Sequence, residues 1–344
     1  LYIVFNPGAG HGDADAVRRV ISEACAAAGR PLHLLDVADP RQLPALARQA
    51  VQAARADGGT VVAAGGDGTI NAVAQAVLGS GCAFGVLPQG TFNYFSRAHG
   101  IPDDPAEALQ LLLTGTPQPV QVGLVNGQVF LVNASLGLYP RLLEDREAWK
   151  RQLGRSRLVA FGALLATLLR GHRSLRLLLD LPGQRQLLRT PTLFVGNNPL
   201  QLAQIGLPQA QAVAAGALAV VAVQPVGRLA LLGLALRGAL GRLGEADQVS
   251  AFGCRSLTVR PGWPWGLRAV KVATDGEVRR LRPPLQFSVS PQPLPLIRPA
   301  PPPAGIADTE ARQRPLQDPH HPSHGPSHHP SHHPPQHRPL PDPV

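Results

Sequence analysis

The run Gly65-Gly66-Asp67-Gly68-Thr69 constrains this chain more than any other feature, because it lies between an apolar segment and a helix-like one. Residues 60–64 have the composition of a buried strand, and residues 70–78 have helical spacing. The three glycines let backbone N–H groups approach a phosphate, and the N-terminus of the helix adds the positive end of its dipole. A carboxylate fits beside a phosphate when a cation lies between them, so Asp67 predicts bound Mg²⁺. The alternative is a tight turn in which Asp67 or Thr69 caps the helix.

The alternation of strand-like and helix-like segments extends over residues 1–120. Strands are predicted over 1–5, 32–37, 60–64 and 83–87, and helices over 13–28, 42–56, 70–78 and 105–113. This pattern is typical of an α/β domain with a parallel sheet, in which ligands bind at the carboxyl ends of the strands. Two more turns are expected at that edge, Asn6-Pro7-Gly8-Ala9-Gly10 and Pro88-Gln89-Gly90-Thr91-Phe92-Asn93. The first of them lacks the fingerprints of dinucleotide-binding and P-loop proteins, which disfavours both classes.

Residues 121–295 change to short apolar runs separated by Gly, Pro and Asn, which predicts a second domain formed by a mainly antiparallel β-sandwich. Its strands are expected at 120–125, 128–133, 192–195, 218–223, 256–259, 269–273 and 285–289, with helical stretches at 141–170 and 229–243. Residues 296–344 are rich in Pro and His and have few side chains to bury. They predict a disordered tail, either simply solvated or binding a transition metal through its imidazoles.

The net charge of +10 is concentrated in two basic blocks, residues 141–189 and 255–282. Such blocks attract the phosphates of nucleic acid or of an anionic membrane. No nucleic-acid-binding module is recognised, so we expect no nucleic-acid partner. The apolar stretch 158–169 has cationic flanks and is either a helix at a membrane interface or a core helix. It is shorter than the ~18 residues that span a bilayer.

The cysteines Cys25, Cys82 and Cys254 are far apart and have no metal-ligand spacing. This pattern favours reduced thiols and a cytoplasmic location.

The three glycine-containing turns, taken together, resemble the diacylglycerol kinase catalytic-domain family. This family includes bacterial lipid kinases and sphingosine kinases and belongs to the same superfamily as NAD kinases. Two later motifs extend the resemblance over about residues 1–295, namely Asn133-Ala134-Ser135-Leu136-Gly137 and Asp275-Gly276-Glu277.

The resemblance implies transfer of the γ-phosphoryl group of ATP, with Mg²⁺, to the hydroxyl of a lipid such as diacylglycerol or a sphingoid base. Glu277 would accept the proton of that hydroxyl, and Asp67 would act in catalysis and hold the metal. Asn93 and Asp275 would lie at the substrate. The nucleotide would be bound by residues of the three turns, which are Asn6, Pro7, Gly8, Ala9, Gly10, Gly65, Gly66, Asp67, Gly68, Thr69 and Thr91. Such an enzyme would work in the cytoplasm, peripherally at the inner, anionic face of the cell membrane. For Asp275-Gly276, a hairpin turn is the alternative interpretation.

Two departures from the family pattern leave alternatives open. Tyr94 stands where the family usually has an Asp, and residues 213–218 lack the Asp-Gly pair of an accessory Mg²⁺ loop, so we expect that accessory site to be absent. One alternative is a soluble NAD kinase-like enzyme, disfavoured because Gly196-Asn197-Asn198-Pro199 carries no carboxylate. The other is a catalytically weak nucleotide- or lipid-binding protein. The sequence does not determine the acceptor or the oligomeric state.

Overall fold

The computed structural model describes residues 1–9, 13–138, 140, 174–262 and 268–300 of the 344-residue chain. Residues Leu1–Ala300 form one compact unit. The expected helix over 141–170 and the expected tail from Pro301 onward lie outside the described residues.

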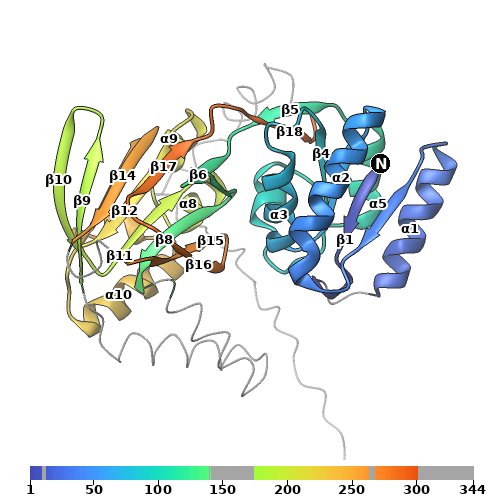
Figure 1. Ribbon diagram of the computed structural model, residues 1–344. Coiled ribbons are helices and arrows are strands. Elements are labelled where there is room, and N and C mark those ends of the chain that lie inside the picture. Colours follow the sequence, from blue (N-terminus) through green and yellow to red (C-terminus); the bar gives the residue numbers. More distant parts are fainter. Residues whose placement is uncertain (10–12, 139, 141–173, 263–267, 301–344) are drawn as a thin grey trace, which may run out of the picture. The chain divides into compact units, whose positions relative to one another are not determined.

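The first sheet, sheet A, has the strand order β2-β1-β3-β4-β18-β5 (Figure 1). Its strands are β1 (Tyr2–Phe5), β2 (His33–Asp36), β3 (Thr60–Gly65), β4 (Ala83–Pro88), β5 (Pro117–Val120) and β18 (Leu294–Ile297). The first four run parallel, as the alternating pattern predicts, and only β5 is antiparallel to its neighbour. Because β2 and β3 lie on opposite sides of β1, the chain reverses its winding direction there, and the carboxyl ends of β1 and β3 flank a crevice.

Helices pack around sheet A because each has an apolar stripe to bury. They are α1 (Ala14–Ala27), α2 (Leu43–Asp57), α3 (Asp67–Val77), α4 (Tyr94–Ala98) and α5 (Pro105–Thr114), with 3-10 turns η1 (Pro7–Ala9) and η2 (Pro40–Gln42). The α3 helix begins at Asp67, three residues before the predicted start, so the glycine-rich run enters the first helical turn.

Sheets B and C are antiparallel and face each other across a shared apolar core, which confirms the predicted sandwich. Sheet B has the order β10-β9-β14-β17-β6-β7 and sheet C the order β13-β12-β11-β8-β15-β16. The strands of sheet B are β6 (Gly123–Val125), β7 (Gln128–Phe130), β9 (Leu175–Leu181), β10 (Gln184–Thr190), β14 (Ser256–Pro261) and β17 (Leu285–Val289). Those of sheet C are β8 (Asn133–Gly137), β11 (Thr192–Gly196), β12 (Leu218–Val223), β13 (Val249–Cys254), β15 (Val270–Thr274) and β16 (Glu277–Leu281).

Short helices connect the strands of sheet C. They are α8 (Pro199–Gln204), α9 (Ala210–Ala214), α10 (Arg228–Ala239) and the 3-10 turn η3 (Leu243–Glu245). The α10 helix confirms the helical stretch predicted near residue 229.

The chain passes from sheet A to sheet B at residues 121–122, so the single strand predicted over 120–125 is in fact two strands, β5 and β6. It returns at its other end, where β18 pairs with β4 and β5. This strand crosses residue 296, the predicted start of the tail. The predicted division into domains at residues 120 and 295 stays a prediction.

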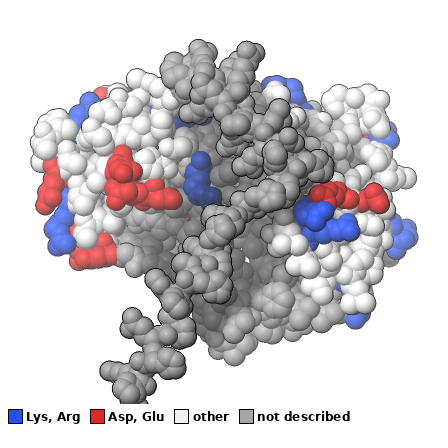
Figure 2. Space-filling model, turned by 180° about the vertical axis from the view of Figure 1, so that it is seen from behind, with Lys and Arg blue, Asp and Glu red and all other residues white. Residues whose placement is uncertain are grey.

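Charged side chains of both signs lie on the described surface. Figure 2 shows acidic side chains beside basic ones, so the net charge of +10 forms no continuous basic patch on the described part of that face. Among the described residues, no helix combines the length and hydropathy needed to cross a bilayer.

Candidate active site

The three glycine-containing turns meet at the carboxyl edge of β1, β3 and β4. The backbone N–H of Asn6 donates to Ala64 O at 2.9 Å, and the N–H of Gln89 donates to Gly65 O at 2.9 Å. The Asn6 side-chain amide donates to Thr69 Oγ1, also at 2.9 Å. These bonds tie the first and third turns to the central one, as the sequence predicts for a parallel sheet.

Two of the glycines are required because other atoms lie where a side chain would be. A Cβ atom at Gly65 would lie 2.7 Å from both Cβ and Oγ1 of Thr69. A Cβ atom at Gly90 would lie 3.1 Å from Cα of Gly66. The second and third turns therefore touch through their backbones, which leaves their polar groups at the surface of the crevice.

A cavity of about 320 Å³ lies between the first and third turns. It is lined by Pro7, Ala14, Val17, Pro88, Gln89, Gly90, Thr91, Asn93, Asp103 and Pro105. Thr91 is exposed here, whereas Asn93 is buried and its side chain is engaged within the protein. The Asn93 amide donates to Asp103 Oδ1 at 3.0 Å, and its Oδ1 accepts from the N–H of Gly90 at 3.0 Å.

The Asp67 carboxyl group is poorly solvated. Burial, with the nearby charge of Asp275 acting in the same direction, raises the pKa of Asp67 from 3.8 to about 6, although backbone N–H groups of Asn93 and Tyr94 donate to it. Its Oδ1 is buried and has no hydrogen-bond partner among the described residues. An unsatisfied buried carboxylate oxygen fits a cation, and Mg²⁺ commonly takes one protein carboxylate together with substrate phosphates. Among the described residues, no three His, Cys, Asp or Glu side chains gather closely enough to hold a metal by themselves, at this site or at another.

Asp275 connects the sandwich to α3. Its Oδ2 accepts from the Asn71 side chain and from the N–H of Leu131, each at 2.7 Å. Its Oδ1 accepts from the N–H groups of Val132 and Asn133 at 2.9 and 3.0 Å. Burial raises the pKa of Asp275, and these four donors act in the opposite direction. The carboxylate thus has internal partners on both oxygens, which points to a positioning function for this residue; substrate contact stays a prediction.

Glu277 lies at the end of the β15–β16 hairpin and reaches the glycine-rich turn. Thr274 pairs with Glu277, and the two residues between them, Asp275 and Gly276, have φ of 49° and 89°. Positive φ at both positions is the geometry of a type I′ turn, so the hairpin predicted from Asp-Gly is present. A Cβ atom at Gly68 would lie 2.8 Å from Glu277 Oε1, which shows how closely the two motifs approach.

Arg279 fixes the orientation of Glu277. Its Nη2 lies 3.0 Å from Glu277 Oε2, and its Nη1 donates to Gln128 Oε1 at 3.1 Å. The Glu277 side chain stays 53% exposed, so its carboxylate is available to a ligand. Sequence reasoning did not identify Arg279 because an arginine on a strand has no distinguishing local pattern.

Other residues that sequence reasoning missed are buried asparagines. Asn71 joins Asp275 to Val129 O, and the Asn198 amide donates to Tyr94 O at 2.9 Å, linking α8 to the third turn. Tyr94, the departure from the family pattern, stacks on Phe92 with ring centroids 5.9 Å apart. The role of these two asparagines depends on contacts with segments far away in the sequence, so no local pattern around them predicts it.

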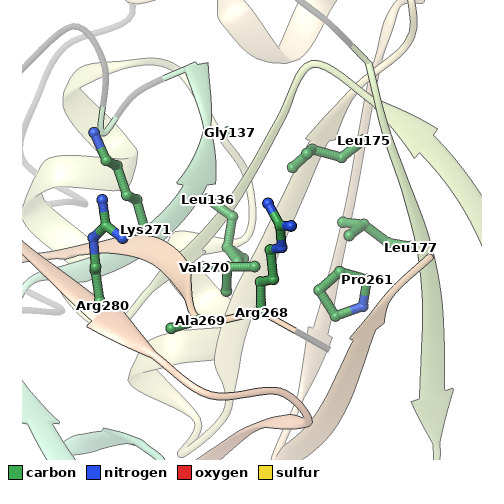
Figure 3. Close-up of a pocket in the computed structure, with 10 residues that line it drawn as sticks. All are labelled: Leu136, Gly137, Leu175, Leu177, Pro261, Arg268, Ala269, Val270, Lys271 and Arg280. Atoms are coloured by element: carbon green, nitrogen blue, oxygen red, sulfur yellow. The ribbon is translucent and has the colours of Figure 1, made fainter. Parts of the chain in front are cut away.

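A second cavity, of about 540 Å³, lies in the sandwich. Figure 3 shows Leu175, Leu177 and Pro261 on one side of it and Lys271 and Arg280 on the other. The remaining lining residues are Leu136, Gly137, Arg268, Ala269 and Val270. Lys271 pairs with Arg280 three residues along the hairpin from the Thr274–Glu277 pair, which is about 10 Å at the usual rise of a strand.

The structure therefore brings Asn6 to Ala9, Gly65 to Thr69, Thr91 and Glu277 around one crevice, with the buried Asn93 and the half-buried Asp275 beneath it. Gly10 lies outside the described residues. The roles assigned to these residues stay predictions.

Residues 1–125 match the model of the diacylglycerol kinase catalytic domain. A Pseudomonas aeruginosa protein named "Probable lipid kinase YegS-like" is 45% identical over 112 residues, which cover 31% of this chain and 37% of that protein. A Bacillus subtilis "Diacylglycerol kinase" is 43% identical over 88 residues, covering 25% of this chain and 29% of that protein. The chain thus matches about a third of the length of these curated relatives. A crystal structure of a diacylglycerol kinase from Bacillus anthracis superposes with a TM-score of 0.61 and 21% identity, covering 87% of this chain and 96% of that one. At this identity the similarity shows a shared fold.

Proposed function

We propose that this chain is a kinase that transfers the γ-phosphoryl group of MgATP to the hydroxyl of a lipid such as diacylglycerol or a sphingoid base, because residues 1–125 match the model of the diacylglycerol kinase catalytic domain and relatives named as lipid kinases match the same region. The observation that carries the proposal is the approach of Glu277 to Gly68. It places a solvent-accessible carboxylate beside a glycine-rich, helix-initiating turn, although 208 residues of chain lie between Gly68 and Glu277.

The turns supply the binding site for the nucleotide phosphates. The backbone N–H groups of Gly66, Gly68 and the rest of the first turn belong to the N-terminus of α3, and a helix N-terminus favours bound anions. Asp67 would hold the Mg²⁺, which when bound neutralises charge on the phosphates. Without the ion, the negative carboxylate of Asp67 would repel the phosphates.

Glu277 is the proposed general base. Its Oε1 takes the proton of the lipid hydroxyl as that oxygen forms a bond to the γ-phosphorus. The bond between the γ-phosphorus and the bridging oxygen of ADP breaks, and ADP leaves with that electron pair. Arg279 holds the other carboxylate oxygen, so the base keeps a fixed direction.

The sandwich cavity supports a lipid acceptor rather than a soluble one such as NAD. Its walls include Leu136, Leu175, Leu177 and Val270, which fit a hydrocarbon chain, and it lies about 10 Å from Glu277 along the hairpin. The segment Gly196 to Pro199, where an NAD kinase-like enzyme would need a carboxylate, instead uses Asn197 and Asn198 for internal hydrogen bonds.

The experiment that tests the proposal is transfer of labelled γ-phosphate from MgATP to diacylglycerol, a sphingoid base, ceramide and polyprenol in mixed micelles, with NAD as a soluble acceptor. We expect label in a lipid. We also expect Glu277→Gln to lower kcat by about 10²–10⁴-fold while MgATP binding, measured by calorimetry, stays unchanged.

Glu107→Gln is the matched control, because Glu107 lies in the first turn of α5, where its substitution leaves the turns intact. An undiminished rate in Glu277→Gln would rule out Glu277 as the base. Label found in NAD alone would contradict a lipid acceptor and identify a kinase that acts on a soluble one.

A further inference from the structure

Helix α10 exposes leucines that an ordinary surface helix would bury. The segment from Arg228 to Leu240 contains six leucines, and a helix packed on one side can bury only part of them. Leu231 and Leu234 are buried against Leu138 and Ala246. Leu229, Leu236 and Leu240 are 80%, 62% and 65% exposed. Among the described residues only Phe92 and Leu187 are other large apolar side chains with comparable exposure.

The exposed leucines form one stripe. At 100° per residue, positions 229, 236 and 240 lie within about 40° of one another around the helix axis. Arg228 and Arg237 are exposed on the two sides of this stripe, at about −100° and +80° from Leu229. Residues 228–244 contain no Asp or Glu, so nothing on the helix opposes the positive charge.

The stripe lies at the end of sheet C that also opens the sandwich cavity. Leu138, which packs under α10, directly follows Gly137, which lines the cavity. The cavity also carries Arg268, Lys271 and Arg280 (Figure 3). Apolar and cationic side chains therefore occur together at this end, and the Glu277 carboxylate lies at the other end of the same hairpin.

We propose that the exposed face of α10, formed by Leu229, Leu236, Leu240, Arg228 and Arg237, docks on an anionic lipid bilayer. The leucines would enter the boundary between headgroups and acyl chains, and the guanidinium groups would contact lipid phosphates. A protein partner is the less favoured occupant, because residues 228–244 carry only positive charge, which matches the uniformly negative surface of an anionic bilayer.

Only the reason for docking rests on the proposed function: docking would bring the sandwich cavity to a lipid substrate. A lipid leaving the bilayer head first would pass its hydroxyl toward Glu277 while its chains stay among the apolar side chains of the cavity. Docking itself requires neither nucleotide nor catalysis, so it can be measured separately.

The test is co-sedimentation of the full chain with vesicles, without nucleotide. One set is phosphatidylcholine and the other has part of it replaced by phosphatidylglycerol. We expect binding to the anionic vesicles, and a loss of about tenfold or more when Leu229, Leu236 and Leu240 are all changed to Ser. Arg228→Gln with Arg237→Gln is expected to remove the preference for phosphatidylglycerol.

Leu187→Ser is the matched control, because Leu187 is 82% exposed on β10, an edge strand of sheet B rather than of sheet C, and its loss is expected to leave binding unchanged. Leu236→Asp provides a second variant if the triple change impairs folding, which circular dichroism would reveal. Equal binding by wild type and the leucine variants would overturn the proposal, as would equal losses in Leu187→Ser. Absence of vesicle binding together with self-association that the leucine variants abolish would identify a protein interface instead.

Failure of docking and failure of the kinase are distinguishable. Vesicle binding through α10 without phosphoryl transfer would support the docking surface and overturn the proposed function. Transfer in detergent micelles that is equal in wild type and the leucine variants, with no vesicle binding, would overturn the docking surface alone.

Discussion

Asp67 is the residue at which stability and the proposed chemistry conflict. Burial raises its pKa above the value of 3.8 that it would have in the unfolded chain, to about 6. A raised carboxyl pKa means that the folded state binds the proton more tightly, so stability falls as pH rises from 3.8 to about 6 and stays lower above that. Proteins commonly accept such a cost at sites that bind a cation.

We therefore predict that Asp67→Asn is more stable than wild type above pH 6 in the absence of metal and nucleotide. The expected gain is on the order of 1–3 kcal/mol, because one pKa unit corresponds to about 1.4 kcal/mol. Urea unfolding at several pH values measures it, and the gain should disappear below pH 3.8. The same variant should lose Mg²⁺-dependent ATP binding. A gain that does not change with pH would show that the carboxyl is not the cause.

Asp275 is predicted to act through the four hydrogen bonds that it accepts. Asn has the same size and tolerates the left-handed backbone at φ 49°, so Asp275→Asn keeps the turn while it removes the charge and one of the two accepting oxygens. We expect the lost hydrogen bonds to outweigh the lower desolvation cost of the neutral side chain. The amide presents N–H groups to donors, and we expect the free energy of unfolding to fall by about 2–3 kcal/mol. Urea denaturation at neutral pH is the measurement. A change under about 0.5 kcal/mol, the range of ordinary surface substitutions, would contradict this function.

At the scale of elements, the β3 to α3 connection depends on close approach at Gly65. A methyl group there would overlap the Thr69 side chain, so Gly65→Ala is expected to lower stability by about 1–3 kcal/mol and to weaken ATP binding. Gly233→Ala is the control, because α10 has open space at Gly233. It should stabilise the chain by about 0.5–1 kcal/mol, as alanine favours the helix. Thermal unfolding and calorimetry measure the two properties, and equal effects of the two changes would refute the steric argument.

The β15–β16 hairpin shows how far an element could be predicted. Asp-Gly predicts the turn by its chemistry, since both positions require positive φ, and the family resemblance assigns Glu277 a chemical role. The two interpretations are compatible, because the turn is what carries Glu277 to Gly68. The strand β16 itself was not predicted. Its sequence, Glu-Val-Arg-Arg-Leu, is polar because β16 is an edge strand of sheet C, and edge strands bury less apolar surface.

At the scale of the whole molecule, β18 makes the stability of sheet A depend on residues near position 296. Among the described strands, β5 pairs only with β18, and Leu294 and Leu296 are fully buried. A fragment of residues 1–120 would expose the edge of β4 and leave β5 unpaired.

We expect that fragment to lack cooperative unfolding, whereas residues 1–300 should unfold in one transition. Far-ultraviolet circular dichroism against urea provides the measurement. If residues 1–120 unfolded cooperatively with the midpoint of the longer chain, sheet A would be an independent domain, as the predicted boundary at residue 120 implies.

The sequence by itself determined the features that depend on local chemistry. The alternation of strands and helices predicted the parallel part of sheet A, and the glycine-rich turns follow β1, β3 and β4, so their convergence at one edge followed from the direction of the strands. The antiparallel sandwich was likewise predicted by short apolar runs between turn residues, although β9, β10, β13, β16 and most of β8 were missed. Backbone geometry and the burial of apolar side chains act over a few residues, so a pattern in the sequence records them directly.

Only the tertiary structure decided the contacts between distant segments. Three contacts of this kind leave no pattern in the sequence. They are the hydrogen bonds that Asp275 accepts, the ion pair of Arg279 with Glu277, and the pairing of β18 with sheet A. The exposure of Leu229, Leu236 and Leu240 was also decided by the tertiary structure, because the sequence does not show which leucines of a helix face the core. Which face is buried depends on what packs against it, and that is settled by the rest of the fold.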